Sequence, residues 1–247
     1  MIGKLLGSIN TFRARRLCET SRYRRAMSDI PPSLYAYWKS TARHEFKGIP
    51  SDAFFFVRAT EGLLTFFDCV RSNARPCALP SAAADSVWHA WSRMAPAQLA
   101  RFCRHHFGGN IPHTEADDMN VGMAEALANS LTAARRLDAL PVAGAGLPRL
   151  FALDRSLNMP HGYAYSIAME QVAFRNMDSR GAEYGKHQFP AALAPIALLE
   201  AGLISLEEYD MSLKNAHPDG SGCGAGCGST SSDGGGGGSC GGGCGGD

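Results

Sequence analysis

Apolar side chains recur at intervals of three to four residues along most of the chain, and this spacing predicts amphipathic helices. The first helix is expected over residues 53–70, with Ser51 or Asp52 placed to cap it. A second helix follows Pro80-Ser81 and ends near residue 94, and a third covers residues 96–107.

The same pattern continues toward the C-terminus. Further helices are predicted over residues 114–140, 163–177, 191–201 and 205–214, with residues 180–190 as an irregular connection. Ser205 and Glu208 have the spacing of a capping box at the start of the last helix. Alternating strand patterns are scarce, so we expect an all-α fold, an irregular helical bundle. A strand remains an alternative at short apolar stretches such as residues 150–153.

A change in composition at Pro218 divides the chain. Fifteen of the 30 residues from 218 to 247 are glycine, and the segment has no Leu, Ile, Val or aromatic side chain. Such a segment buries too little apolar surface to offset its ordering entropy, which predicts a disordered tail. We therefore expect three parts: a basic N-terminal segment (1–30), a helical globular domain (31–217) with a terminal helix pair at 190–216, and the tail (218–247).

Charge is balanced overall but not locally. The formal net charge is +1, whereas residues 1–30 alone carry about +5. We interpret this basic start as a solvated amphipathic helix packed on the domain, with contact to a membrane surface as the alternative. Its short, interrupted apolar run is unlike a signal peptide, and no apolar stretch is long enough for a transmembrane helix.

The eight cysteines form two groups. Those before residue 110 lack a paired spacing, and without a secretion signal they are expected to be reduced thiols of a cytoplasmic protein. Four lie in the tail, at Cys223, Cys227, Cys240 and Cys244. Four thiolates would suit zinc or copper. The tail also looks like the heterocyclised region of thiazole/oxazole-modified microcins, but the interpretation that we favour is a flexible spacer or weak interaction tail.

The densest group of chemically functional side chains lies between residues 85 and 113. Its members are Asp85, Trp88, His89, Phe102, Cys103, His106, Phe107, Gly108 and His113. Asp85 and His89 are one helical turn apart, so the carboxylate would orient the imidazole. Folding the two helices against each other would bring His89, His106 and His113 together as a metal site. The competing interpretation is an aromatic core anchored by Trp88, with His105 solvated on the other side of its helix.

This segment resembles the glycine-rich domain-containing proteins of bacteria and plants. The resemblance rests on Asp85-x-x-Trp88-His89, then Phe102-Cys103, Phe107-Gly108 and His113, and on the tail; it covers residues 50–115. That family often has a Trp-His-x-His core, and here Trp91 replaces its second histidine. Because the family is poorly characterised, the resemblance implies a fold region more than an activity, and a metal site taken from that core would lack a ligand.

No nucleophile elbow, phosphate loop, dinucleotide loop or zinc-protease motif is present. Asp154, Glu170 and Glu183 are candidate catalytic carboxylates, but nothing in the sequence distinguishes them from other acidic residues. The terminal helix pair is similar to short C-terminal modules that mediate interaction. We therefore expect a non-catalytic interaction or scaffold protein with a protein partner. The alternatives are a metal-binding protein that uses the tail cysteines, a modified tail, and an enzyme acting at Asp85 and His89.

Overall fold

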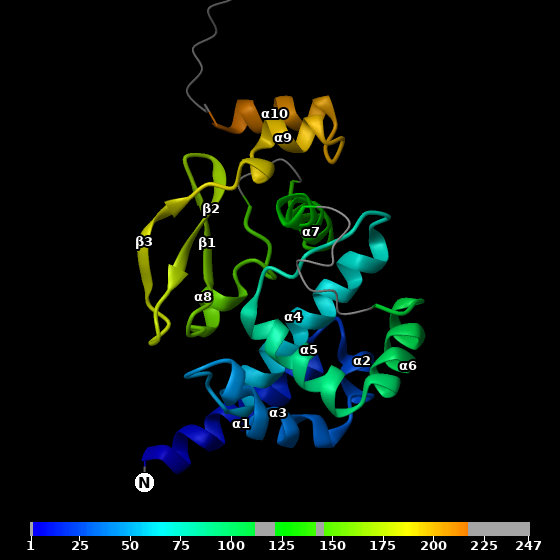
Figure 1. Cartoon of the computed structure of the whole chain (residues 1–247), viewed down its shortest axis with the longest axis vertical. Helices are drawn as coiled ribbons and strands as arrows, with labels where there is room; N and C mark the ends of the chain where they lie inside the picture. Colours follow the sequence, from blue (N-terminus) through cyan, green and yellow to red (C-terminus); the bar gives the residue numbers. More distant parts are fainter. Residues whose placement is uncertain (1, 112–121, 142–145, 217–247) are drawn as a thin grey trace, which may run out of the picture.

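The computed structural model of the chain describes residues 2–111, 122–141 and 146–216 (Figure 1). The helices are α1 (Ile2–Thr20), α2 (Arg24–Ser28), α3 (Pro32–Glu45), α4 (Ala53–Ser72), α5 (Ala82–Met94), α6 (Pro96–Phe107), α7 (Met123–Leu137), α8 (Leu153–Leu157), α9 (Pro195–Glu200) and α10 (Leu206–Ala216), with a 3₁₀ turn, η2 (Ala191–Leu193). The strands are β1 (Tyr163–Ala168), β2 (Gln171–Met177) and β3 (Glu183–Gln188). No helix in the described ranges is both long enough and apolar enough to cross a membrane.

Local capping explains where the central helices begin and end. The Asp52 carboxylate accepts hydrogen bonds from two backbone N–H groups of the first turn of α4, and the Ser81 hydroxyl accepts one at the start of α5. Pro96 occupies the first turn of α6, where a missing N–H costs nothing, and Gly108 ends that helix with a φ of +77°. These helices match the sequence prediction within a few residues.

Helix α4 lies at the centre of the core. It packs against α1, α5 and α7, and α3 packs against α5 (Figure 1). Aromatic rings fill part of this core: Trp38 of α3 is fully buried, and its ring centroid lies 5.9 Å from that of Phe55 and 5.2 Å from that of Phe56 of α4. Its indole N–H donates a 3.0 Å hydrogen bond to the Ser86 hydroxyl of α5, which satisfies the polar atom inside the core.

The all-α prediction is wrong, because the fold also contains an antiparallel sheet of order β1-β2-β3. The predicted helix over residues 163–177 is the β1–β2 hairpin, and the predicted irregular connection contains β3. The large side chains of the hairpin alternate: Tyr163, Tyr165 and Ile167 in β1, then Val172 and Phe174 in β2. Aromatic and β-branched residues at a period of two favour strands, and cross-strand packing overrides the weaker helical pattern.

The residues of the hairpin turn explain why the hairpin was not predicted from the sequence. Met169 and Glu170 both adopt left-handed conformations, with φ of +48° and +62°. Two-residue hairpin turns of this kind usually contain Asn-Gly or Asp-Gly, and Met-Glu lacks that signal.

The terminal helix pair is present but shorter than predicted at its start. The expected helix over residues 191–201 is divided into η2 and α9, because the ring of Pro195 disfavours helical geometry at Ala194. At α10 the capping box is complete: the Glu208 backbone N–H donates to the Ser205 hydroxyl (3.1 Å), and the Ser205 N–H donates to the Glu208 carboxylate (2.7 Å). The predicted helix over residues 114–140 corresponds to α7, and its expected first turns lie outside the described residues.

Candidate functional site

The tryptophan–histidine segment contributes its aromatic rings to the core. Trp88 is 5% exposed and its ring lies 5.3 Å from that of Phe67 on α4. Phe102 of α6 lies 4.7 Å from Trp91 of α5, so these rings join the two helices. Cys103 is fully buried, and burial raises its pKa to about 11. Its thiol therefore stays protonated at neutral pH and is a poor metal ligand.

His89 lies between two carboxylates on the surface of α5. Its Nδ1 atom is 2.5 Å from Glu45 Oε1 at the end of α3, and its Nε2 atom is 3.4 Å from Asp85 Oδ2. Arg93 also binds Glu45, at 2.7 Å. Burial raises the pKa of Glu45, but the hydrogen bonds from Arg93 and His89 outweigh it, and the net shift is downward. The group joins α3 to α5 and lies outside the lining of the pocket described below.

His106 has a different carboxylate partner. Its Nε2 atom is 3.0 Å from Asp29 Oδ2, at the end of α2. The neighbouring His105 is exposed, and its ring centroid lies 4.6 Å from that of His106. Asp29, His105 and His106 can each direct one ligand atom to a common region, all within 4.8 Å of one another. Of the predicted metal ligands that the described ranges include, His106 lies here and His89 does not, since His89 contacts Glu45 and Asp85.

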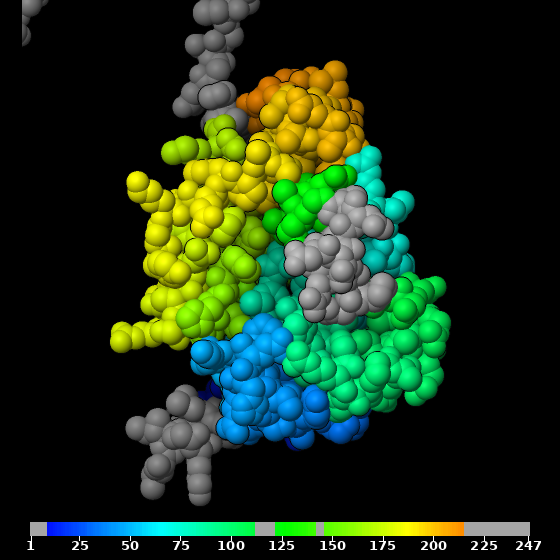
Figure 2. Space-filling model, in the orientation of Figure 1, coloured from blue at the N-terminus to red at the C-terminus, as the bar shows by residue number. Residues whose placement is uncertain are grey.

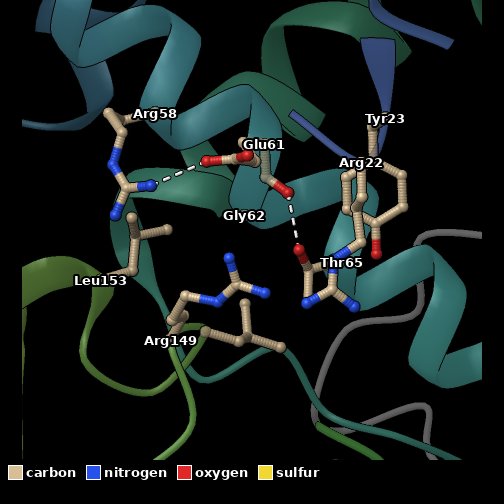
Figure 3. A pocket seen from close by; sticks show the side chains of 9 residues that line it. Arg22, Tyr23, Arg58, Glu61, Gly62, Thr65, Arg149 and Leu153 are labelled. Carbon is tan, nitrogen blue, oxygen red and sulfur yellow. Dashed lines mark hydrogen bonds and ion pairs between the residues drawn. The ribbon is translucent and has the colours of Figure 1, made fainter. Parts of the chain in front are cut away.

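A small pocket, partly open to solvent, lies beside α4 (Figure 3). Its lining residues are Arg22, Tyr23, Arg58, Glu61, Gly62, Thr65, Arg149, Leu150 and Leu153. Arg58 donates to Glu61 at 2.7 Å, and the hydroxyl of Ser21 donates to the same carboxylate at 2.7 Å. The lining therefore carries three guanidinium groups and one carboxylate.

The other two arginines of the pocket are also held by a carboxylate. Arg22 donates to Asp138 at 2.8 Å, and Arg149 donates to it at 2.7 Å from Nη2 and 3.0 Å from Nε. Figure 3 shows the Arg149 side chain extending into the pocket. The Asp138 side chain is only 6% exposed, and burial raises its pKa despite the opposing effect of Arg22. The Arg22 pair joins the segment after α1 to the end of α7, and the Arg149 pair joins the end of α7 to the segment before α8, so both stabilise the fold.

Asp154 is a buried carboxylate with four hydrogen-bond donors. Its Oδ1 atom accepts from the Ser81 hydroxyl (2.6 Å) and the Ala83 N–H (3.0 Å), and its Oδ2 atom accepts from the N–H groups of Ala82 (3.0 Å) and Tyr163 (3.1 Å). Burial raises its pKa, and the four donors act in the opposite direction. Since every oxygen is occupied, Asp154 connects α8, the start of α5 and β1 rather than reacting.

The other two candidate catalytic acids, Glu183 and Glu170, lie in the sheet and in its hairpin turn. Glu183 of β3 pairs with Arg155 at 2.7 Å and with Arg175 of β2. Glu170 is exposed in the hairpin turn. His113 and the tail residues Cys223, Cys227, Cys240 and Cys244 lie outside the described residues.

Sequence reasoning did not find Asp29 or Glu45, the acids that contact His106 and His89. Each comes from an N-terminal helix, 77 and 44 positions away from its histidine. No local spacing marks either residue, because the contact exists only after the helices have packed.

Comparison with protein-family models matches residues 56–189 to a family described as UCP032817-like. No curated protein and no solved structure matches the chain. The matched range begins within α4 and ends after β3, so it includes α5, α6, α7 and the whole sheet. Because this range is more than half of the chain, the protein belongs to the UCP032817-like family.

Proposed function

We propose that this protein acts by binding a partner protein through an exposed apolar surface on α9 and α10. This terminal surface consists of Ile196 of α9 with Leu206 and Leu213 of α10, which are 46–63% exposed; Leu206 and Leu213 are two turns apart and so share one face of α10. Among the described residues, six of the eleven exposed large apolar side chains lie between positions 184 and 213. Scattered apolar residues are ordinary on a protein surface, whereas such a concentration is typical of an interaction site.

The charges around the terminal surface favour one kind of partner. Residues 195–216 carry four acidic side chains, Glu200, Glu207, Glu208 and Asp210, against the single cation Lys214. An apolar centre with an acidic rim is complementary to a protein surface that has an apolar centre and a basic rim. The same acidic rim would be repelled by anionic lipids, so a membrane is a poor occupant.

The terminal surface is held in place by the body of the protein (Figure 2). Leu198 of α9 is fully buried. Arg75 donates to the carbonyl of Ala201 at 2.6 Å, and Arg136 donates to the carbonyl of Leu203 at 2.9 Å. Side chains on an anchored element lose less conformational freedom on binding than those on a free one, which favours affinity.

The contacts of His89 and Asp154 support a non-catalytic role. His89 is held between Glu45 and Asp85, and Asp154 uses both of its oxygens in packing. The resemblance of residues 50–115 to glycine-rich domain-containing proteins stays a prediction, and so does a metal-binding or modified tail.

The test uses a photo-crosslinking amino acid at position 206 of the full chain in its native cells, with position 36 on α3 as the exposed control. We expect a protein that is crosslinked from position 206 and not from position 36. Binding of that protein in purified form should weaken at least about tenfold, or about 1.4 kcal/mol, in Leu206→Ser and in Glu207→Lys/Asp210→Lys. Ala36→Ser should bind normally. Equal crosslinking from both positions, or affinities unchanged by these substitutions, would refute the proposal.

A further inference from the structure

We propose that Asp29, His105 and His106 bind a divalent transition-metal ion, with Zn²⁺ as the best fit. The chemistry of the three groups supports this assignment: imidazole nitrogen and carboxylate oxygen are the usual ligands of Zn²⁺ when no thiolate takes part. Two histidines with one carboxylate form a known catalytic and surface ligand set that leaves at least one position for water. This site is separate from the terminal surface and does not depend on it.

The distances require only small movements. Ligands 2.0–2.1 Å from a tetrahedral ion lie roughly 3.3–3.4 Å apart. His106 Nε2 and Asp29 Oδ2 are already 3.0 Å apart, and all three ligand atoms fall within 4.8 Å of one another. The side chain that must move most is His105, which is exposed and therefore free of close packing that would resist the movement.

The surroundings of His106 prepare it for binding. Its side chain is 14% exposed and packs against Phe102, whose ring centroid lies 4.6 Å away. Packing restricts the ring to few rotamers, so little conformational entropy remains to be lost on coordination. Asp29 is the C-terminal cap residue of α2, where its backbone N–H bonds the carbonyl of Ala26. The ring of His106 and the backbone of Asp29 are therefore held by local structure.

The electrostatic setting of the site also favours a cation. His105 and His106 occupy the last turn of α6, where the unpaired carbonyl groups carry the negative end of the helix dipole. A bound ion would replace the hydrogen bond between His106 and Asp29 by two coordinate bonds. It would also join α2 to α6 through residues 77 positions apart in the chain.

The experiment must distinguish Zn²⁺ bound at this site from Zn²⁺ bound by the tail thiols. The suitable parent is therefore the full chain with Cys223, Cys227, Cys240 and Cys244 replaced by serine. The body cysteines interfere little, because burial raises the pKa of Cys18 and Cys77 and keeps both thiols protonated.

Zn²⁺ is titrated into this parent against a chromophoric chelator, and thermal unfolding is followed with and without the ion. We expect one equivalent of Zn²⁺ per chain and a higher Tm when it is present. His105→Ala and Asp29→Asn should each weaken binding at least about tenfold, since each removes one of three ligands. His44→Ala is the matched control, because His44 is an exposed histidine in the last turn of α3.

His105 and Asp29 are exposed, so their replacement should leave the fold intact, which circular dichroism checks. The proposal is overturned if the parent shows no saturable Zn²⁺ binding. It is equally overturned if the Asp29→Asn/His105→Ala double variant binds as tightly as the parent, or if His44→Ala weakens binding to the same extent.

Discussion

Replacing Asp154 by asparagine tests the main polar link between the sheet and the helices. Asparagine has nearly the same shape but only one acceptor oxygen. In the orientation that keeps Oδ1, it still accepts from Ser81 and Ala83, and its NH₂ group then faces the N–H groups of Ala82 and Tyr163. Two backbone donors that point at this buried carboxylate lose their acceptor.

The expected cost follows from the burial of the site. Asp154 is 1% exposed, so water cannot replace the lost acceptor. A buried donor without a partner costs about 1–3 kcal/mol, which gives about 2–6 kcal/mol for two. This is a large share of the roughly 5–15 kcal/mol that stabilises a typical domain, so the variant should unfold at much lower urea concentration.

Urea unfolding followed by tryptophan fluorescence and circular dichroism measures this difference, with the slope m as a check on two-state behaviour. Asp178→Asn is the matched control. Asp178 also accepts two backbone hydrogen bonds, from Arg180 and Ala182, but it is only partly buried and a single oxygen accepts both. Its loss of stability should be far smaller. If both variants unfold at the same urea concentration as the unaltered protein, our account of the buried carboxylate is wrong.

Two other substitutions test the sheet and the α3–α5 contact. Gly181→Ala should destabilise by more than about 2 kcal/mol, because φ is +74° and a Cβ atom would lie 2.1 Å from the carbonyl oxygen of Asn158. Gly185→Ala, with a φ of +79° and open space around the Cβ position, should lose only about 1–2 kcal/mol, and equal losses in the two variants would contradict the steric argument. Glu45→Gln removes the ion pair with Arg93 and should lower the Tm at neutral pH. Because the pKa of Glu45 is lowered from 4.5, the contribution of its charge is present above pH 4.5 and is lost as the pH falls through the lowered value. The Tm difference between Glu45→Gln and the unaltered protein should therefore shrink on acidification, and a constant difference would contradict it.

Local sequence signals located most helices correctly. Asp52 and Ser81 mark the starts of α4 and α5, and Ser205 with Glu208 marks α10. Each signal works because the capping side chain and the N–H groups that it satisfies are within four positions of one another. The fold class was missed for a related reason: the Met169-Glu170 turn lacks the residues that usually announce a hairpin.

The sequence by itself determined the limits of the capped helices and the aromatic character of the core around Trp88. Only the tertiary structure decided that residues 163–177 form strands and that Asp29 lies beside His105 and His106. It also decided that Asp154 accepts hydrogen bonds from the first turn of α5. The difference is one of range along the chain. Helix caps depend on neighbours a few residues away, whereas these pairings depend on how whole elements pack, which no short stretch of sequence specifies.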